Sequence, residues 1–146
     1  MSHVQTQLMS RITFLLTGFD TTGNRVYQAS EHPLTPATLP GLTIALGDER
    51  NVGGTMNSTI KQVDLLIGVY VSGDDFTVSA QAMVEIEEAL YGDYANGRYF
   101  NGLALSVVYQ GCSNNYVATT AVRHTKKVVR YTIEYQTADG HADTAC

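Results

Sequence analysis

The chain has no tryptophan and only two cysteines, Cys112 and Cys146, in 146 residues. Two widely separated cysteines exclude a disulfide framework and indicate a reducing compartment. A chain of this length buries about 68–70% of the surface of its unfolded form, so it needs neither a disulfide nor a metal to fold. We therefore expect a single globular domain over residues 1–146, in which the polar residues at about 138–146 form a flexible tail.

Charge is also scarce, since only 16% of the residues are charged and the net charge is −5. A low charge fraction leaves neutral polar surface, which suits contacts between subunits. The acidic balance argues against a general nucleic-acid binder, because such domains carry a basic excess. The longest apolar run, Leu65 to Val71, is too short to cross a bilayer, so we expect no membrane partner.

The usual motifs of enzymes and metalloproteins are missing from the sequence. No serine lies in a nucleophile elbow, and no phosphate-binding glycine loop precedes a helix. The four histidines have no partner at zinc-ligand spacing. Glu85, Glu87 and Glu88 are expected to form a solvated helix face and not an acid/base pair. We therefore expect no catalysis, no cofactor and no metal.

Two segments have the period of amphipathic helices. Apolar residues recur at three- and four-residue steps from Val4 to Phe19, and Gly18 with the polar residues after it favours an end there. A second helical pattern runs from Phe76 to Leu90, after a start signal at Asp74 and Asp75.

Five further segments have the composition or alternation of strands. The clearest runs from Thr59 to Val71, where Val63, Leu65, Ile67, Val69 and Val71 share one face. The expected strands cover residues 25–27, 42–46, 59–71, 103–109 and 128–137. The order α-β-β-β-α-β-β predicts an α+β fold: a mixed, mainly antiparallel sheet of four to five strands with two helices packed on one face. A proline-containing loop, a glycine-rich stretch at 47–57 and a polar connection at 111–120 link the strands.

Two groups of charged residues stand out. A basic cluster near the last strand consists of Arg123, His124, Lys126, Lys127 and Arg130. One interpretation is that these charges guard the edge of a final strand against aggregation. The other is that they complement an acidic surface, such as the Glu85–Glu88 helix of a neighbouring copy, or lie near DNA. Asp48, Glu49 and Arg50 lie in the 47–57 stretch, which is either a mobile hairpin tip or a segment that orders against a neighbouring subunit.

The arrangement of these segments resembles the tail-terminator proteins of long-tailed bacteriophages, the group that includes the minor tail protein U family. The similarity covers nearly the whole chain and lies in the order of its segments. These are the N-terminal helix, Arg25-Val26-Tyr27, the proline loop with Leu39 to Ile44, the long alternating strand, the helix start at Asp74-Asp75, Gly102 to Leu105, and the final strand from Tyr131 to Thr137.

The resemblance implies a structural virion protein at the head–tail junction, assembled in the host cytoplasm. Members of the family form a homohexameric ring that caps the tail tube, stops its polymerisation and docks the head. The implied partners are other copies of the chain, the tail tube protein and a head-completion or stopper protein, with passive contact to DNA in the channel. A ring needs two unlike patches on each copy. The residues expected to supply them are Arg123, Lys126, Lys127, Arg130, Glu85, Glu87, Glu88, Asp48, Glu49 and Arg50.

Three alternatives remain open from the sequence. Within the same class, the chain resembles other connectors, so a head-closure or tail-completion protein of the neck is the second hypothesis. A small enzyme would need a pocket that gathers His124 with Asp64 or Glu134. A nucleic-acid module is suggested by the α-β-β-β-α order of double-stranded RNA-binding cores, but the net acidity and the extra closing strands argue against it.

Overall fold

The computed structural model describes residues 3–28, 40–55, 57–72, 76–117, 124–138 and 141–145. Within these ranges the two predicted helices are α1 (Val4–Leu16) and α2 (Phe76–Gly92). The strands are β1 (Val26–Tyr27), β2 (Gly41–Thr55), β3 (Ser58–Ser72), β4 (Tyr94–Ala95), β5 (Arg98–Tyr99), β6 (Ser106–Val117), β7 (His124–Ala138) and β8 (His141–Ala145). The predicted order of helices and main strands is confirmed, and β4 and β5 form a small separate hairpin after α2.

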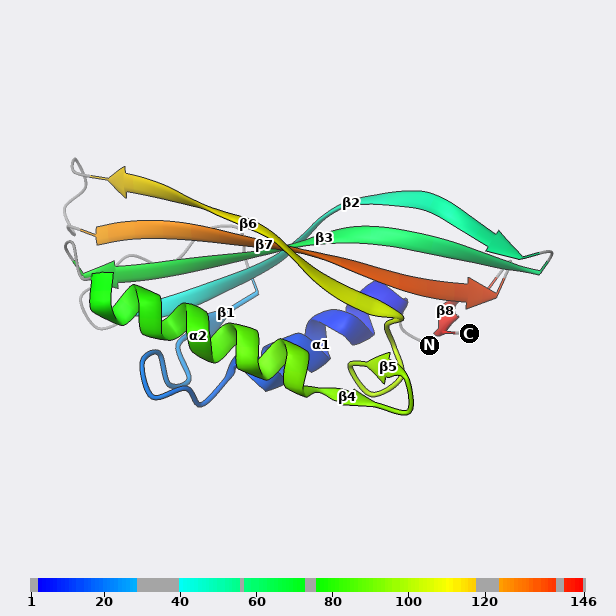
Figure 1. Ribbon diagram of the computed structural model, residues 1–146, viewed down its shortest axis with the longest axis horizontal. Helices are drawn as coiled ribbons and strands as arrows, with labels where there is room; N and C mark the ends of the chain where they lie inside the picture. The colour runs from blue at the N-terminus through cyan, green and yellow to red at the C-terminus, as the bar shows by residue number, and fades with distance from the viewer. Residues whose placement is uncertain are drawn as a thin grey trace.

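The main sheet has the strand order β1-β2-β3-β7-β6, and both helices lie on one of its faces (Figure 1). β1 pairs with β2 in parallel, and every other pairing along this order is antiparallel. The expected α+β class and the mixed, mainly antiparallel sheet are therefore confirmed. Residues 141–145, where a flexible tail was expected, instead form β8 and pair with the end of β7.

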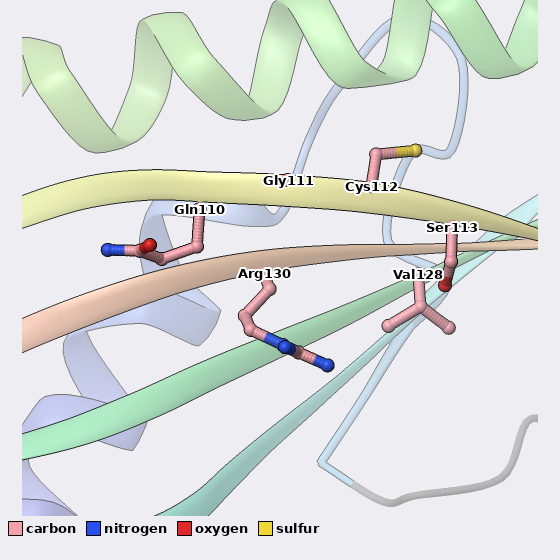
Figure 2. A pocket seen from close by; sticks show the side chains of 6 residues that line it. All are labelled: Gln110, Gly111, Cys112, Ser113, Val128 and Arg130. Atoms are coloured by element: carbon pink, nitrogen blue, oxygen red, sulfur yellow. The ribbon is translucent and has the colours of Figure 1, made fainter.

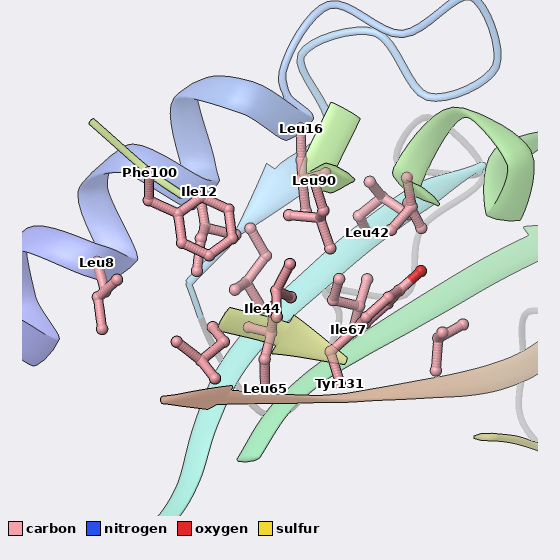
Figure 3. Packing of buried hydrophobic residues seen from close by; sticks show 14 of the residues in the cluster. Leu8, Ile12, Leu16, Leu42, Ile44, Leu65, Ile67, Leu90, Phe100 and Tyr131 are labelled. Atoms are coloured by element: carbon pink, nitrogen blue, oxygen red, sulfur yellow. The ribbon is translucent and has the colours of Figure 1, made fainter. Parts of the chain in front are cut away.

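The core lies between the sheet and the two helices. Val63, Leu65, Ile67, Val69 and Val71 of β3 are all buried, as their alternation predicts. The helices cover them with residues spaced three or four apart: Leu8, Ile12 and Leu16 from α1, and Ala82, Ile86 and Leu90 from α2. Figure 3 shows Leu8, Ile12, Leu16 and Leu90 of the helices in this core, together with Phe100 and Tyr131. Full burial of one such side chain stabilises the fold by about 1.5–3 kcal/mol.

The first helix is fixed at both ends by local contacts. The Nδ1 atom of His3 accepts a hydrogen bond from the Gln5 N–H at 3.0 Å, which caps the first turn. The helix ends at Leu16, three residues before the predicted end, because Gly18 takes a φ of +91° and reverses the chain. Phe19 still packs against the core from the turn that follows.

An ion pair joins α1 to Asp93, the residue that follows α2. Nε and Nη2 of Arg11 donate hydrogen bonds to the two carboxylate oxygens of Asp93, each at 2.9 Å. This forked arrangement matches the geometry of a carboxylate. The hydrogen bonds that Arg11 donates to Asp93 raise the pKa of Arg11 above its ordinary value, although desolvation acts in the opposite direction.

Two polar segments expected to be loops are strands. β2 continues through the 47–57 stretch to Thr55 and pairs with β3, with register shifts between Leu46 and Glu49 and between Asn51 and Gly53. β6 begins at Ser106 and not at Leu103, and it continues through the expected connection at 111–120 as far as Val117. Pairing with a long neighbouring strand satisfies the backbone of these segments despite their polar composition. The prolines at 33 and 36 and the helix start at 74–75 lie outside the described residues.

Candidate subunit interface

The basic cluster does not guard a sheet edge. β7, which carries most of it, lies between β3 and β6, and β3 pairs with it along fifteen residues. The interpretation of these charges as edge protection is therefore wrong, since a strand with a neighbour on each side has no open edge. Arg123 lies outside the described residues, and His124 is described only as the first residue of β7.

The basic side chains on β7 are divided between the two faces of the sheet. Lys127 is paired with Val69, whose side chain is in the core, so Lys127 lies on the helix-covered face. Lys126 and Arg130 lie on the opposite face, which we call the open face. The Nζ atom of Lys126 lies 5.4 Å from the centre of the Tyr70 ring. The predicted cluster is thus two separate positive groups.

The open face carries a polar network that uses several of the predicted residues. Nη2 of Arg50 donates to Oε1 of Gln62 at 2.8 Å and forms an ion pair with Oδ1 of Asp64 at 3.2 Å. The hydroxyl of Thr132 donates to the same Asp64 oxygen at 3.4 Å, and Gln62 donates to Glu134 at 3.3 Å. The hydrogen bond to Asp64 raises the pKa of Arg50. Arg50 therefore holds β2 to β3 within one copy.

The neighbouring Glu49 also makes contacts within the chain. Its Oε1 atom accepts a hydrogen bond from the Tyr135 hydroxyl and another from Nε2 of Gln5 at 2.8 Å. Tyr135 is fully buried in β7, so this group ties the first turn of α1 to the hairpin and the core. Asp48 is exposed beside it. The 47–50 segment thus stabilises the fold through Glu49 and Arg50.

The three glutamates of α2 also differ in their surroundings. Glu87 and Glu88 are exposed on α2, as predicted. Glu85 is half-buried, and its Oε2 atom accepts a hydrogen bond from the Asp20 N–H at 3.0 Å. The expectation that all three glutamates lie on one solvated face is therefore wrong for Glu85, which holds the turn after α1. Two acidic side chains of α2 remain facing solvent.

The residues considered for an enzyme site are engaged in the network of the open face. Asp64 accepts from Arg50 and Thr132, and Glu134 accepts from Gln62. The side chain of His124 lies outside what is described. Within the described ranges, no group of three or more histidine, cysteine or acidic residues could hold a metal ion. None of the described helices is both long enough and apolar enough to span a membrane.

A feature that the sequence prediction missed lies along β6. This strand ends the strand order of the main sheet, and its twelve residues contain no charged residue and no proline. Beside it, between β6, β7 and α2, is a hollow of about 360 Å³. Its lining is mainly apolar: Ala80, Met83, Val84, Glu87, Tyr109 and Tyr131. We call β6 together with this hollow the β6 side. The sequence signal was the uncharged run 106–117, which was interpreted in part as a loop.

Three tyrosines organise the β6 side. The hydroxyl oxygen of Tyr91 accepts a hydrogen bond from the Tyr109 N–H at 2.9 Å. Tyr109 also packs edge-on against Tyr131, with ring centres 5.5 Å apart. Burial raises the pKa of Tyr131 well above its ordinary value, and the charge of Glu87 raises it further. The lining of the hollow therefore includes two tyrosine rings in contact and one carboxylate, that of Glu87.

β6 contains a bulge, which changes the face of the sheet to which the following side chains point. The register with β7 shifts between Tyr109 and Gly111, and Gly111 has a φ of +146°. After this shift Cys112 points toward α2, whereas Arg130 and Val128 of β7 point away from it (Figure 2). Cys112 is exposed and carries a free thiol.

The other end of the sheet is different in character. There β1 pairs with β2 only at Leu42 and Thr43, and α1 covers the helix-side face. A hollow of about 380 Å³ lies between α1, β1 and β2. Its lining carries no charged side chain: Gln5, Thr6, Met9, Ser10, Gln28 and Leu46. We call this the α1 side. The two sides of one chain are thus unlike. One has an uncharged strand and an acidic helix. The other has an uncharged hollow and a helix without carboxylates, and Glu49 is bound to Gln5 at its rim.

Comparisons with known proteins give little beyond this. No protein-family model matches the chain, and no curated protein matches its sequence. A solved structure of similar shape is a chain of the "Virion of native gene transfer agent (GTA) particle", with 22% sequence identity, 90% of this chain and 92% of that chain covered, and a TM-score of 0.49. A likeness of this size carries no conclusion about function.

Proposed function

We propose that this protein is a structural virion protein of a long-tailed bacteriophage, in which identical copies form a ring that caps the tail tube. The ring stops polymerisation of the tube protein and provides the surface that docks the head. Six copies are expected, as in the family that the sequence resembles. The protein works through its surfaces and performs no reaction.

The observation that carries this proposal is the difference between the two sides of the sheet. A closed ring of identical copies needs a contact in which one patch meets a different patch on the next copy. The β6 side is uncharged along its strand and acidic on α2, where Glu87 and Glu88 face solvent. The α1 side has no acidic residue in its helix. Two such sides on one compact domain are suited to a repeating head-to-tail contact.

The order of elements supports the same function. The helix, the long hairpin, the second helix and the final strand pair occur in the order that the resemblance implies. The charged residues predicted for the interface fall into two groups. Glu85, Glu49 and Arg50 bind within the copy, whereas Glu87, Glu88, Lys126, Lys127 and Arg130 remain as candidates for contacts with partners.

The proposal is tested by removing the gene product from an assembling phage and measuring tail length by electron microscopy. Loss of the terminator is expected to give tails of uncontrolled length that do not join heads. Native mass measurement of the protein recovered from tails should give a six-copy ring. Normal tails without the protein, or a monomer in the assembled particle, would contradict the proposal. Joining defects with tails of normal length would instead indicate a head-closure protein, which should co-purify with portal or adaptor and not with tube protein.

A further inference from the structure

We infer that the ring contact is made between the β6 side of one copy and the α1 side of the next copy. This inference rests on the proposed ring and names the two surfaces that close it. The juxtaposition that carries it is an uncharged strand edge beside an acidic helix at one end of the sheet, and a helix without carboxylates at the other end.

The outer edge of β6 is suited to contact with another protein chain. Soluble proteins protect open strand edges with charged residues, proline or bulges. β6 has no charged residue and no proline along its twelve residues, and its one register shift lies between Tyr109 and Gly111. Val108 and Tyr109 are 49% and 44% exposed, and they lie on opposite faces of this edge strand. Val84, 47% exposed, extends the apolar surface onto α2. Among the described strands only β7 pairs with β6, and the Tyr91 hydroxyl oxygen accepts a hydrogen bond from one of its N–H groups, at Tyr109. An uncharged strand edge with exposed apolar side chains promotes association with another chain.

Charge selects the partner side. α2 contains three glutamates and no basic residue. A symmetric contact, in which two β6 sides meet, would bring the Glu87 and Glu88 side chains of two copies together along one seam. Like charges across an interface disfavour association. The α1 helix contains one charged residue, Arg11, and no carboxylate, so placing it beside α2 of the next copy avoids this repulsion.

The strand β2 indicates which residues of the α1 side form the contact. The distal half of β2 carries Asp48, Glu49 and Arg50 and two register shifts, features that protect an edge. Residues 44–46 lie beyond the part of β2 that pairs with β1, and they are uncharged. Met9 and Ser10 of α1 line the hollow beside them. We therefore expect the next copy to contact residues 44–46 and this side of α1, leaving the hairpin tip outside the contact.

Cys112 provides a direct test because it is exposed on β6. In a Cys146→Ser background, Ser10→Cys places a second thiol on the α1 side. Mild oxidation or a short bis-maleimide reagent should then link the copies of assembled rings into a ladder that extends to the full ring. The matched control is Val84→Cys, which places the second thiol on the β6 side with Cys112 and should give no ladder.

The outcomes separate the inference from the proposed function. Dimers from Cys112 alone, or from Cys112 with Val84→Cys, would mean that two β6 sides meet and would overturn the inference. Intact six-copy rings without a ladder in the Ser10→Cys protein would also overturn it, while the ring function would stand. Absence of rings from tails containing the wild-type protein would instead contradict the proposed function.

A second variant tests the same contact without cysteines. Val84→Asp adds a carboxylate to an exposed position, so the monomer should fold normally. In the contact it would lie in an apolar hollow next to Glu87, and ring association should weaken by about tenfold or more. Val52→Asp is the control, because Val52 is 46% exposed in the hairpin tip, which lies outside the expected contact. Equal ring formation by the Val84→Asp variant and the wild type would overturn the inference.

Discussion

Lys127 and Arg130 lie on opposite faces of the sheet although they are only three positions apart in β7. Lys127 is paired with the buried Val69, and Arg130 is paired with Leu66, whose side chain is on the open face. A strand alternates its side chains, so an odd separation always divides two residues between the faces. Charge on β7 is therefore divided between the two faces of the sheet, and each face could contact a different partner.

This division gives a prediction that separates the two faces. Lys126→Glu with Arg130→Glu reverses the charge of the open face, whereas Lys127→Glu reverses it beside the helices. All of these positions are half-buried or exposed, so circular dichroism should show folded protein in each case. If one face binds an acidic partner, only the variants of that face should lower virion yield. Normal yield from the triple variant would mean that the charges serve solubility alone.

Replacing Ile67 with aspartate should unfold the domain. Ile67 is fully buried opposite Ile44 and Val129, where an unpaired carboxylate has neither water nor a donor. The expected loss exceeds about 4 kcal/mol, a large part of the stability of an ordinary domain. Leu66→Asp is the matched control, since it introduces the same group one residue away on the open face, beside Arg130. Urea unfolding measures both, and equal losses would contradict the assignment of faces.

Tyr131 should make the protein sensitive to alkaline pH. An ordinary tyrosine has a pKa of 10.0, and burial raises that of folded Tyr131. As the pH rises above about 10, the unfolded chain loses this proton while the folded protein keeps it, so the free energy of unfolding falls. Tyr131→Phe cannot ionise, and it should reduce this fall by up to about 1.4 kcal/mol per pH unit. Denaturant unfolding between pH 9 and 11 measures the slope, and identical slopes would exclude the effect.

Gly68 should not tolerate a methyl group. On the open face of β3, a Cβ atom at this position would approach the Thr43 hydroxyl and would lie 2.9 Å from Cε2 of Tyr70. Both neighbours are buried, so Gly68→Ala is expected to cost about 1–3 kcal/mol. Gly53→Ala is the control, because a Cβ atom there has no neighbour within 4 Å. Equal thermal stability of the two variants would show that Tyr70 moves aside freely.

Much of the fold could be predicted because its core follows simple periods. The alternation of β3 and the three- and four-residue steps of the helices identify the buried residues correctly. The extensions of β2 and β6 could not be predicted in this way. Residues such as Gly53 and Asn114 favour turns by themselves, but they pair with Ile60 and Lys127 of central strands. Strand formation there depends on a neighbour distant in sequence, which a local pattern does not reveal.

The candidate interface was harder to predict than the fold. Grouping charges by closeness in sequence joined Lys126 with Lys127, which the strand places on opposite faces, and Glu85 with Glu88, of which only Glu88 is exposed. The more informative signal was the absence of charge from Ser106 to Val117. Its meaning depends on β6 being the last strand of the sheet, which follows from the strand order and not from composition.

The long pairing of β3 with β7 also bears on when assembly can start. Their partner residues are at least 52 positions apart in the chain, from Ser72 and His124 outward. Pairings between such distant segments form slowly. β6 joins the main sheet only through β7, so its outer edge becomes the margin of that sheet only when β7 has paired with β3. Any contact that uses the completed margin together with α2 therefore depends on this slow, long-range pairing.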